Sequence, residues 1–204
     1  MPFVTVEGIE GSGKSTQVRR LGEALGDRAL VTKEPGGTRL GEAIRDLLLD
    51  PGSAGLVAEA ELLLYFADRA QHVRERIRPA LAAGRTVLCD RYTDSSFAYQ
   101  GYGRGLDLAA LRHVADFATG GLGPDLTLFL DVPVETGLLR VRERGGADRL
   151  EAETRAFHER VRQGYERLIL EDPQRWVRVD GRGTPDAVAA RMASALERRG
   201  VPVG

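Results

Sequence analysis

The chain has 204 residues, 42% of them hydrophobic, and 29 Lys and Arg balance 30 Asp and Glu to leave a formal net charge of −1. This length suffices for one domain with a substantial core, spanning 1–204, while the near-neutral charge argues against a nucleic-acid coat or a polybasic membrane surface. One cysteine excludes an intrachain disulfide and a cysteine-based zinc cluster, and no signal peptide or membrane span is recognisable, so we expect a cytoplasmic protein without nucleic-acid or membrane partners.

The N-terminal residues combine an apolar run with a glycine-rich turn. Residues 2–6 (Pro-Phe-Val-Thr-Val) have the composition of a buried strand, and apolar residues at helical spacing begin at Val18. Between them, 8–15 is Gly-Ile-Glu-Gly-Ser-Gly-Lys-Ser, which fits G-x-x-x-x-G-K-S. Strand, glycine loop and helix form the context that a phosphate-binding loop requires.

Each residue type in this loop has a chemical reason. Glycines let successive backbone N–H groups turn around phosphate oxygens, and the helix N-terminus adds partial positive charge. Lys14 would reach the β- and γ-phosphates and Ser15 would hold Mg²⁺. The alternative is a glycine-rich turn without a ligand, but the flanking pattern favours nucleotide binding. The expected nucleotide-binding residues are Gly8, Ile9, Glu10, Gly11, Ser12, Gly13, Lys14, Ser15 and Thr16.

Strands and helices are predicted to alternate along the rest of the chain. A nearly continuous apolar composition in the strands favours a parallel sheet with helices on both faces, which is an α/β fold of the P-loop NTPase type with five strands. Pro79 is expected to bend or divide the longest helix. The further expected strands are 29–32, 86–89, 126–132 and 176–179, and the expected helices are 39–49, 56–83, 107–118, 134–144, 151–170 and 185–198.

Polar residues follow the predicted strands, where ligands of such sheets bind. Glu34 follows the second strand and Asp90 the third. Asp90 is placed like the metal-side aspartate of P-loop enzymes, and we favour that role over a helix N-cap or turn. Asp131 also ends a strand, but we expect it to cap the next helix.

Arginines and aromatic residues are spaced for a second phosphorylated ligand. Arg45, Arg69 and Arg91 suit phosphate because guanidinium groups bind its oxygens in pairs, although a single Arg is often only a surface residue. Tyr65 lies four residues before Arg69, so both share a helix face and together suit a nucleobase. A lone aromatic at this spacing is more often a core residue.

Two later segments suggest a pocket wall and a mobile lid. Residues 95–105 mix amide, hydroxyl and aromatic groups and then become glycine-rich, which predicts a helical turn followed by a flexible loop. A lid is expected at about 140–150, because arginines flank the hinge-like pair Gly145-Gly146. An exposed charged helix is the alternative for Arg140 and Arg142. The lid arginines are Arg140, Arg142, Arg144 and Arg149, and the histidines, His72, His113 and His158, are expected to be solvated or to pack.

Taken together, these motifs resemble those of the bacterial thymidylate kinases over nearly the whole chain. The phosphate loop is shared by many nucleotide enzymes, whereas the Glu-Pro-Gly-Gly-Thr and Tyr-Gln-Gly stretches are much more specific. The resemblance rests on 7–16, on 33–38 (Lys-Glu-Pro-Gly-Gly-Thr), on 90–92 (Asp-Arg-Tyr) and on 95–101, with Ser-Ser followed by Ala-Tyr-Gln-Gly.

The resemblance implies Mg²⁺-dependent transfer of the ATP γ-phosphoryl group to dTMP, giving dTDP and ADP. In that family's pattern, Ser15 and Asp90 serve Mg²⁺, and Arg45 and Arg91 bind the dTMP phosphate. The implied groups for transfer are Lys14, Arg91, Arg144, Arg149 and Glu10.

The implied acceptor site also includes residues for the base and sugar. Arg69 and Gln100 would hydrogen-bond the base, Tyr99 would disfavour a ribose 2′-hydroxyl, and Glu34 would meet the sugar. Tyr65 stands where the family usually has Phe, so either Tyr65 or Phe66 would stack on thymine. The whole set is Glu34, Arg45, Tyr65, Phe66, Arg69, Arg91, Ser95, Ser96, Tyr99 and Gln100.

The resemblance further implies a homodimer, for which the apolar helices between Leu56 and Ala83 are candidates. Two alternatives to this function stay open. One is a kinase for another nucleoside monophosphate or a deoxynucleoside, which would share the loop, Asp90 and the lid. The other is a regulatory NTP-binding switch, which would bind nucleotide without acceptor-dependent turnover.

Overall fold

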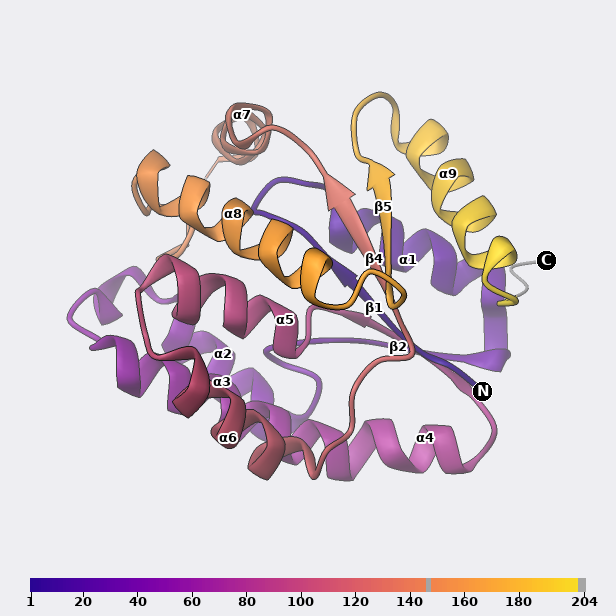
Figure 1. The fold of residues 1–204 in the computed structure, drawn as a ribbon, viewed down its shortest axis with the longest axis horizontal. Helices are drawn as coiled ribbons and strands as arrows, with labels where there is room; N and C mark the ends of the chain where they lie inside the picture. The colour runs from indigo at the N-terminus through magenta and orange to yellow at the C-terminus, as the bar shows by residue number, and fades with distance from the viewer. Residues whose placement is uncertain (146–147, 202–204) are drawn as a thin grey trace.

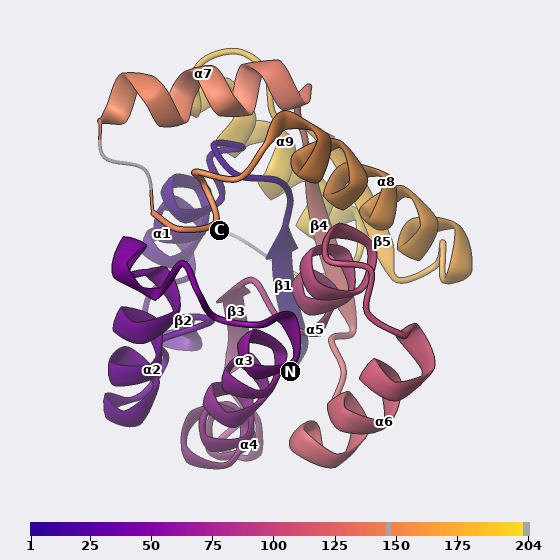
Figure 2. The ribbon, with the colours of Figure 1, turned by 90° about the vertical axis from the view of Figure 1, so that its left-hand side faces the viewer.

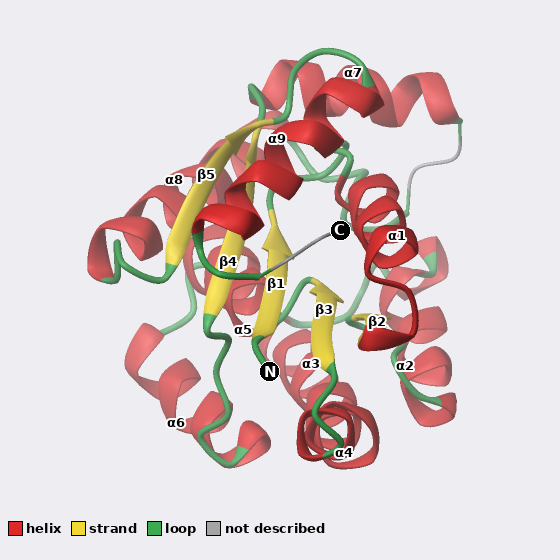
Figure 3. Ribbon diagram, turned by 90° about the vertical axis from the view of Figure 1, so that its right-hand side faces the viewer, coloured by secondary structure: helices red, strands yellow, loops and turns green. Residues whose placement is uncertain are grey.

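The computed structural model describes residues 1–145 and 148–201. Its centre is a five-stranded parallel sheet with the order β2-β3-β1-β4-β5 (Figure 3), so the expected α/β fold is confirmed. The strands are β1 (Phe3–Glu7), β2 (Ala29–Lys33), β3 (Thr86–Asp90), β4 (Leu126–Asp131) and β5 (Trp176–Asp180).

The central strands are buried because helices cover both faces of the sheet. Every residue of β1 and β3 is buried, which explains why both are apolar runs rather than alternating sequences. Even the polar side chain of Thr5 is satisfied inside, through a 2.8 Å hydrogen bond to the hydroxyl of Thr127 on β4.

One face of the sheet is covered by α1 (Lys14–Leu25) and α9 (Pro185–Arg198), which lie side by side (Figure 3). Their Val, Leu and Met side chains pack on the inner strands. The remaining helices form the other layer and the rim (Figure 2). They are α2 (Arg39–Leu49), α3 (Ala58–His72), α4 (Arg78–Ala82), α5 (Thr93–Ser96), α6 (Leu108–Thr119), α7 (Val134–Arg144) and α8 (Arg155–Glu171).

Side-chain caps fix where several helices begin. The hydroxyl of Thr154 accepts a hydrogen bond from the N–H of Phe157, so α8 begins at Arg155 and not at Glu151 as expected. Residues 151–153 form a turn instead, held by hydrogen bonds to the carboxylate of Asp148. No helix within 1–145 and 148–201 combines the length and the apolar character needed to cross a membrane.

The segment after β3 differs from its prediction. A loop was expected over the glycines of 101–105, but α5 continues into a π-helical segment, η4 (Phe97–Gly103), and the loop begins only at 104. These glycines permit close packing: a Cβ on Gly101 would lie 2.5 Å from Leu108, and one on Gly103 would lie 2.8 Å from Phe157. The long helix predicted over 56–83 is confirmed as α3 and α4 joined by π-helical η3 (Val73–Ile77), which directly precedes the turn containing Pro79.

Besides the π-helical η3 and η4, the described residues contain two short 3-10 segments. Both follow helices: η1 (Gly26–Arg28) leads from α1 into β2, and η2 (Pro51–Ser53) follows α2. Helix α7 lies beyond the carboxyl ends of β4 and β5 (Figure 1). The arrowhead of β1 points toward the same side (Figure 2), so the phosphate loop and α7 come together there.

Candidate functional site

A cavity of about 520 Å³ opens beyond the carboxyl ends of β1 and β3. Residues from the first, second and third strand ends line it together with residues of α3, η4 and α7. Most of the expected site residues contribute to its wall. They are Glu10, Gly11, Gly13, Lys14, Ser15, Thr16, Glu34, Arg45, Tyr65, Arg69, Asp90, Arg91, Ser95, Ser96, Tyr99, Gln100 and Arg144, whereas Gly8, Ile9, Ser12, Phe66 and Arg149 do not line it.

The phosphate loop leaves backbone donors unused at the start of α1. Gly13 is the N-cap, with a left-handed φ of 96°, and no side chain caps the first turn. Gly11 has a φ of 67°, and a Cβ there would lie 2.1 Å from the carbonyl oxygen of Gly137 on α7. Glycine is therefore required at 11 both for conformation and for contact with α7. The free N–H groups and the helix dipole make this loop an anion site.

Lys14 lies inside the loop that it belongs to. Its Nζ donates hydrogen bonds to the carbonyl of Ile9 at 2.8 Å and to Oγ of Ser12 at 3.2 Å. Burial, with repulsion from Arg91, lowers the pKa of this amine to about 8. A buried ammonium held by two weak neutral acceptors is poised to take phosphate oxygens in their place.

Ser15 and Asp90 meet at the edge between the loop and β3. The Ser15 hydroxyl donates to Oδ2 of Asp90 at 2.6 Å, while Oδ1 of Asp90 is buried without a hydrogen-bond partner among the described residues. Within 1–145 and 148–201 no group of three or more His, Cys, Asp or Glu forms a complete metal cage. One carboxylate with one hydroxyl fits Mg²⁺, which usually keeps waters and takes the rest of its ligands from substrate phosphates.

Arg91 connects the loop to the part of the cavity wall that carries Ser95 and Tyr99. Its φ of 72° is a conformation that non-glycine residues rarely adopt. One terminal nitrogen donates to Glu10 at 2.6 Å and to the Tyr99 hydroxyl at 3.2 Å, and the other donates to Ser95 at 3.1 Å. Although burial opposes ionisation of Glu10, the charges of Arg91 and Lys14 lower its pKa, so Glu10 is an anion facing two cations.

A buried carboxylate beneath Arg91 was not singled out by the sequence analysis. Glu7 accepts hydrogen bonds from the N–H of Tyr92 at 2.8 Å, from Ser95 at 2.6 Å and from the hydroxyl of Tyr165 at 2.9 Å. Burial, with repulsion from Asp94, raises its pKa to about 7. The sequence feature that could have pointed to Glu7 is its place as an acidic residue at the end of an otherwise largely apolar strand.

Arg69 lines the cavity and is fixed there by three partners. It is almost fully buried and donates to Glu34 at 2.6 Å, to Ser96 at 3.0 Å and to the carbonyl of Tyr92 at 3.0 Å. The planar guanidinium therefore presents its remaining N–H groups to the cavity in one orientation.

Glu34 is itself held by a histidine from α3. His72 Nδ1 lies 2.8 Å from the Glu34 carboxylate, and Nε2 lies 2.7 Å from the hydroxyl of Thr32. His113 is exposed and His158 buried, as the two expected alternatives allow, whereas His72 is a buried hydrogen-bonded partner that sequence reasoning missed. The sequence feature that could have pointed to His72 is its position three residues after Arg69, which places both residues on the same face of the helix.

The structure distinguishes the two aromatic candidates. Tyr65 lines the cavity. Phe66 points the other way, packing with Leu62 and Leu111 and lying 4.6 Å below the guanidinium of Arg69. Tyr65 is therefore the ring available to a ligand, and Phe66 supports Arg69 from behind.

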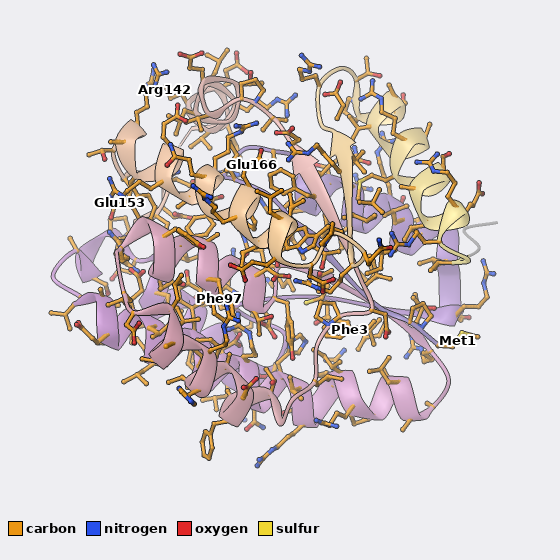
Figure 4. All side chains as sticks on the ribbon, in the orientation of Figure 1. Met1, Phe3, Phe97, Arg142, Glu153 and Glu166 are labelled. Atoms are coloured by element: carbon orange, nitrogen blue, oxygen red, sulfur yellow. The ribbon has the colours of Figure 1, made fainter. Side chains whose placement is uncertain are left out.

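The lid arginines lie in different places. Arg140 donates to the loop carbonyl of Gly11 at 3.3 Å, and Arg144 lines the cavity while pairing with Glu151 at 2.5 Å. Arg142 is on the exposed side of α7 (Figure 4). Arg149 is buried away from the cavity, where it pairs with Glu61 at 2.6 Å. Of the expected hinge pair Gly145-Gly146, Gly146 lies outside the described residues.

Asp131 does not cap α7, contrary to expectation. The N-cap of α7 is Pro133, without a side-chain cap, and the Asp131 carboxylate instead accepts from Arg162 at 3.0 Å and from Arg178 at 2.7 Å. Its proximity to two arginines from α8 and β5 explains its low pKa, because their hydrogen bonds and charges outweigh partial burial.

Comparisons with known proteins agree with this arrangement. The family model described as thymidylate kinase matches residues 6–192. A thymidylate kinase from Desulfovibrio desulfuricans is 52% identical over 205 residues, covering 96% of this chain and 94% of that protein, and one from Synechococcus is 55% identical over 202 residues, covering 97% and 95%.

A solved structure is similar throughout. The crystal structure of thymidylate kinase from Ehrlichia chaffeensis superposes with a TM-score of 0.79 at 32% identity, covering 96% of this chain and 98% of that one. The family match extends over the phosphate loop, the Arg91 segment and the residues of α3 and η4 that line the cavity. This chain therefore belongs to the thymidylate kinase family.

Proposed function

We propose that this chain transfers the γ-phosphoryl group of ATP to dTMP, giving dTDP and ADP. The observation that carries the proposal is one cavity in which a phosphate loop, with Lys14, faces a pocket containing Tyr65 and Arg69. A phosphate site and a base-sized polar pocket in one chamber suit transfer between two nucleotides. Membership of the thymidylate kinase family supports dTMP as the acceptor.

The donor half of the site is proposed to be the loop and its two polar neighbours. The free N–H groups at the start of α1 and the ammonium of Lys14 hold the ATP phosphates. Ser15 and Asp90 hold Mg²⁺. When bound, this ion neutralises negative charge on the phosphate oxygens.

The acceptor phosphate is proposed to lie between Arg45 and Arg91. Arg45 lines the cavity and donates to the carbonyl of Pro35 at 3.0 Å, which directs its guanidinium along the wall. The attacking oxygen of a phosphate monoester is already anionic at neutral pH, so the site needs no strong general base. Orientation by the two arginines and charge neutralisation then supply the rate acceleration.

For the base and sugar we propose Tyr65 as the stacking ring and Arg69, Ser96 and Gln100 as the polar contacts. All four line the cavity. Tyr99 stands beside Arg91 and Glu10, where its ring can exclude a ribose 2′-hydroxyl, and Glu34 lies between Arg69 and His72 at the sugar side.

The lid role is proposed for Arg144, with Arg140 and Glu10 beside it. Arg144 is 60% exposed and has only Glu151 as an ion-pair partner among the described residues, so it can exchange that carboxylate for phosphate oxygens. Arg149 is proposed to restrain the segment after the lid, through Glu61, and not to contact ATP.

We also propose a homodimer formed by α3 and α6, which pack together in the chain. Two large apolar residues stand out on them: Leu63 is 57% exposed and Phe117 is 87% exposed. Phe117→Arg should convert the dimer to a monomer in sedimentation equilibrium. A cytoplasmic location suits an ATP-dependent enzyme whose one thiol, Cys89, is buried and unpaired.

The test is acceptor-dependent ADP release with ATP and Mg²⁺ across dTMP, dUMP, UMP, dCMP, GMP, AMP and thymidine, with Lys14→Ala as the blank. Preference for dTMP, lost in the blank, is the expected result. Preference for another acceptor would favour a kinase of different specificity. ADP release that no acceptor increases would contradict the kinase and favour a regulatory switch.

A further inference from the structure

Glu61, on the first turn of α3, is a fully buried carboxylate outside the proposed list of ligand contacts. It accepts a hydrogen bond from Nε2 of Gln100 at 2.8 Å. Arg104 donates to both of its oxygens, at 3.2 and 3.0 Å, and Arg149 lies 2.6 Å from Oε2. Two arginines and an amide therefore surround one carboxylate.

The carboxylate fixes which end of the Gln100 amide faces the cavity. Burial opposes ionisation of Glu61, but the hydrogen bonds and charges of Arg104, with Gln100 and Arg149, lower its pKa and keep it ionised. An ionised carboxylate only accepts hydrogen bonds, so the NH₂ of Gln100 must point toward it. Because Gln100 lines the cavity, its carbonyl Oε1 is then left for a ligand.

We propose that Glu61 is a positioning residue that selects the pyrimidine through Gln100, an inference that rests on the proposed function. Oε1 of Gln100 accepts a hydrogen bond from a base with an N3–H group, as thymine and uracil have. Cytosine presents an unprotonated N3, so two acceptors would face each other in a buried site, which strongly disfavours dCMP. The methyl group of thymine plays no part in this selection.

Glu61→Gln is expected to reverse the choice. Oε2 of Glu61 has the two closest arginine contacts, at 2.6 Å from Arg149 and 3.0 Å from a terminal nitrogen of Arg104, so the new amide keeps its oxygen there. Its NH₂ then takes the place of Oε1, where it gives up the longer 3.2 Å bond from Nε of Arg104 and faces Gln100. Gln100 must then offer its Oε1 to residue 61 and its NH₂ to the cavity. That orientation accepts the unprotonated N3 of cytosine and repels N3–H.

The experiment compares kcat/KM for dTMP, dUMP and dCMP in wild type, Glu61→Gln and the matched control Arg104→Met. The control removes a charged partner of Glu61 but leaves its bond to Gln100. In Glu61→Gln, the dCMP to dTMP ratio should rise about tenfold or more, with the dUMP to dTMP ratio changed less than about twofold. Arg104→Met should change neither ratio by more than about twofold.

An unchanged dCMP to dTMP ratio in folded Glu61→Gln, or an equal rise in Arg104→Met, would overturn the inference. If Glu61→Gln alone does not fold, Glu61→Gln with Arg149→Met removes one guanidinium left unneutralised, and the same ratio is read. Wild type that does not prefer dTMP to dCMP would contradict the proposed function itself. Preference for dTMP with an unmoved ratio contradicts only the role of Glu61.

Discussion

The hydroxyl of Ser15 and the carboxylate of Asp90, 75 residues apart in the chain, are joined by a 2.6 Å hydrogen bond. Parallel pairing of β1 with β3 places Val6 opposite Asp90, so the loop that follows β1 starts beside this carboxylate. The second oxygen of Asp90 is buried and has no partner among the described residues. A hydroxyl beside a carboxylate oxygen that lacks a partner suits the magnesium role proposed for this pair.

Asp90→Asn should therefore raise the Mg²⁺ concentration for half-maximal activity by about 10–100-fold, since the amide keeps the Ser15 contact but loses the charge. The measurement is a Mg²⁺ titration at saturating ATP, with the melting temperature as a control for folding. An unchanged Mg²⁺ dependence would argue that the ion is held elsewhere.

Activity should decline as pH rises above the pKa of Lys14. Burial lowers that pKa from 10.5 to about 8 in the free enzyme, and only the protonated amine attracts phosphate. The kcat/KM for ATP should fall between pH 8 and 9.5, whereas Lys14→Arg, which stays charged, should lack this limb even at a lower rate. The same alkaline limb in Lys14→Arg would assign it to another group.

The free energy of unfolding should also depend on pH, because of Glu7. Its pKa is raised from 4.5 to about 7, so the folded protein binds more protons than the unfolded chain between these values. The free energy of unfolding should therefore fall as pH rises from 4.5 to 7, by at most about 1.4 kcal/mol per pH unit. Urea unfolding at several pH values should show this slope in wild type and not in Glu7→Gln.

Tyr65 and Phe66 should respond differently to truncation. Tyr65→Phe keeps the stacking face and should change kcat/KM for dTMP by less than about threefold, while Tyr65→Ala should lower it by about 10–100-fold. Phe66→Ala should instead destabilise the fold by about 3 kcal/mol, because it empties a packed site under Arg69. Loss of dTMP affinity in Phe66→Ala without loss of stability would reverse the assignment.

Arg144 and Arg149, from the segment expected to form a lid, should also respond differently to substitution. Arg144→Gln should lower kcat by about 10²-fold at a stability cost of about 1 kcal/mol or less, since Arg144 is 60% exposed and the new amide can still donate to the buried Glu151. Arg149→Gln should cost about 3 kcal/mol of stability, because it removes a partner of the buried Glu61. Equal kcat losses at unchanged stability in both variants would mean that Arg149 also reaches ATP.

The sequence was sufficient for elements that follow local rules. Apolar runs located all five strands, and the spacing of Gly8, Gly13 and Lys14 located the phosphate loop. The loop was predicted to begin too early, at 101 instead of 104, because a glycine needed for close packing cannot be told from a glycine in a loop by sequence alone. The start of α8 was placed too early because the Thr154 cap was not recognised.

The polar interior was beyond sequence reasoning for a different reason. Glu61 and Arg149 are 88 residues apart in the chain, and only tertiary packing brings them together. The spacing of residues in the sequence does not predict such a pair, and a Glu or an Arg taken singly is expected on a solvent-exposed helix face. His72 and Glu7 were missed for the same reason, since their partners come from other strands and helices.

The close contact between Gly11 and Gly137 fixes one point of α7 against the phosphate loop. Backbone touches backbone there, so the helix is seated on the phosphate loop at a point that no side-chain rotation can alter. Arg140 lies three residues beyond that point and Arg144 seven, or about 4.5 and 10.5 Å along the helix axis. If α7 tilts about the contact between Gly11 and Gly137, Arg144 moves roughly twice as far as Arg140. A tilt of α7 would therefore change the position of Arg144 in the cavity more than it changes the hydrogen bond from Arg140 to Gly11.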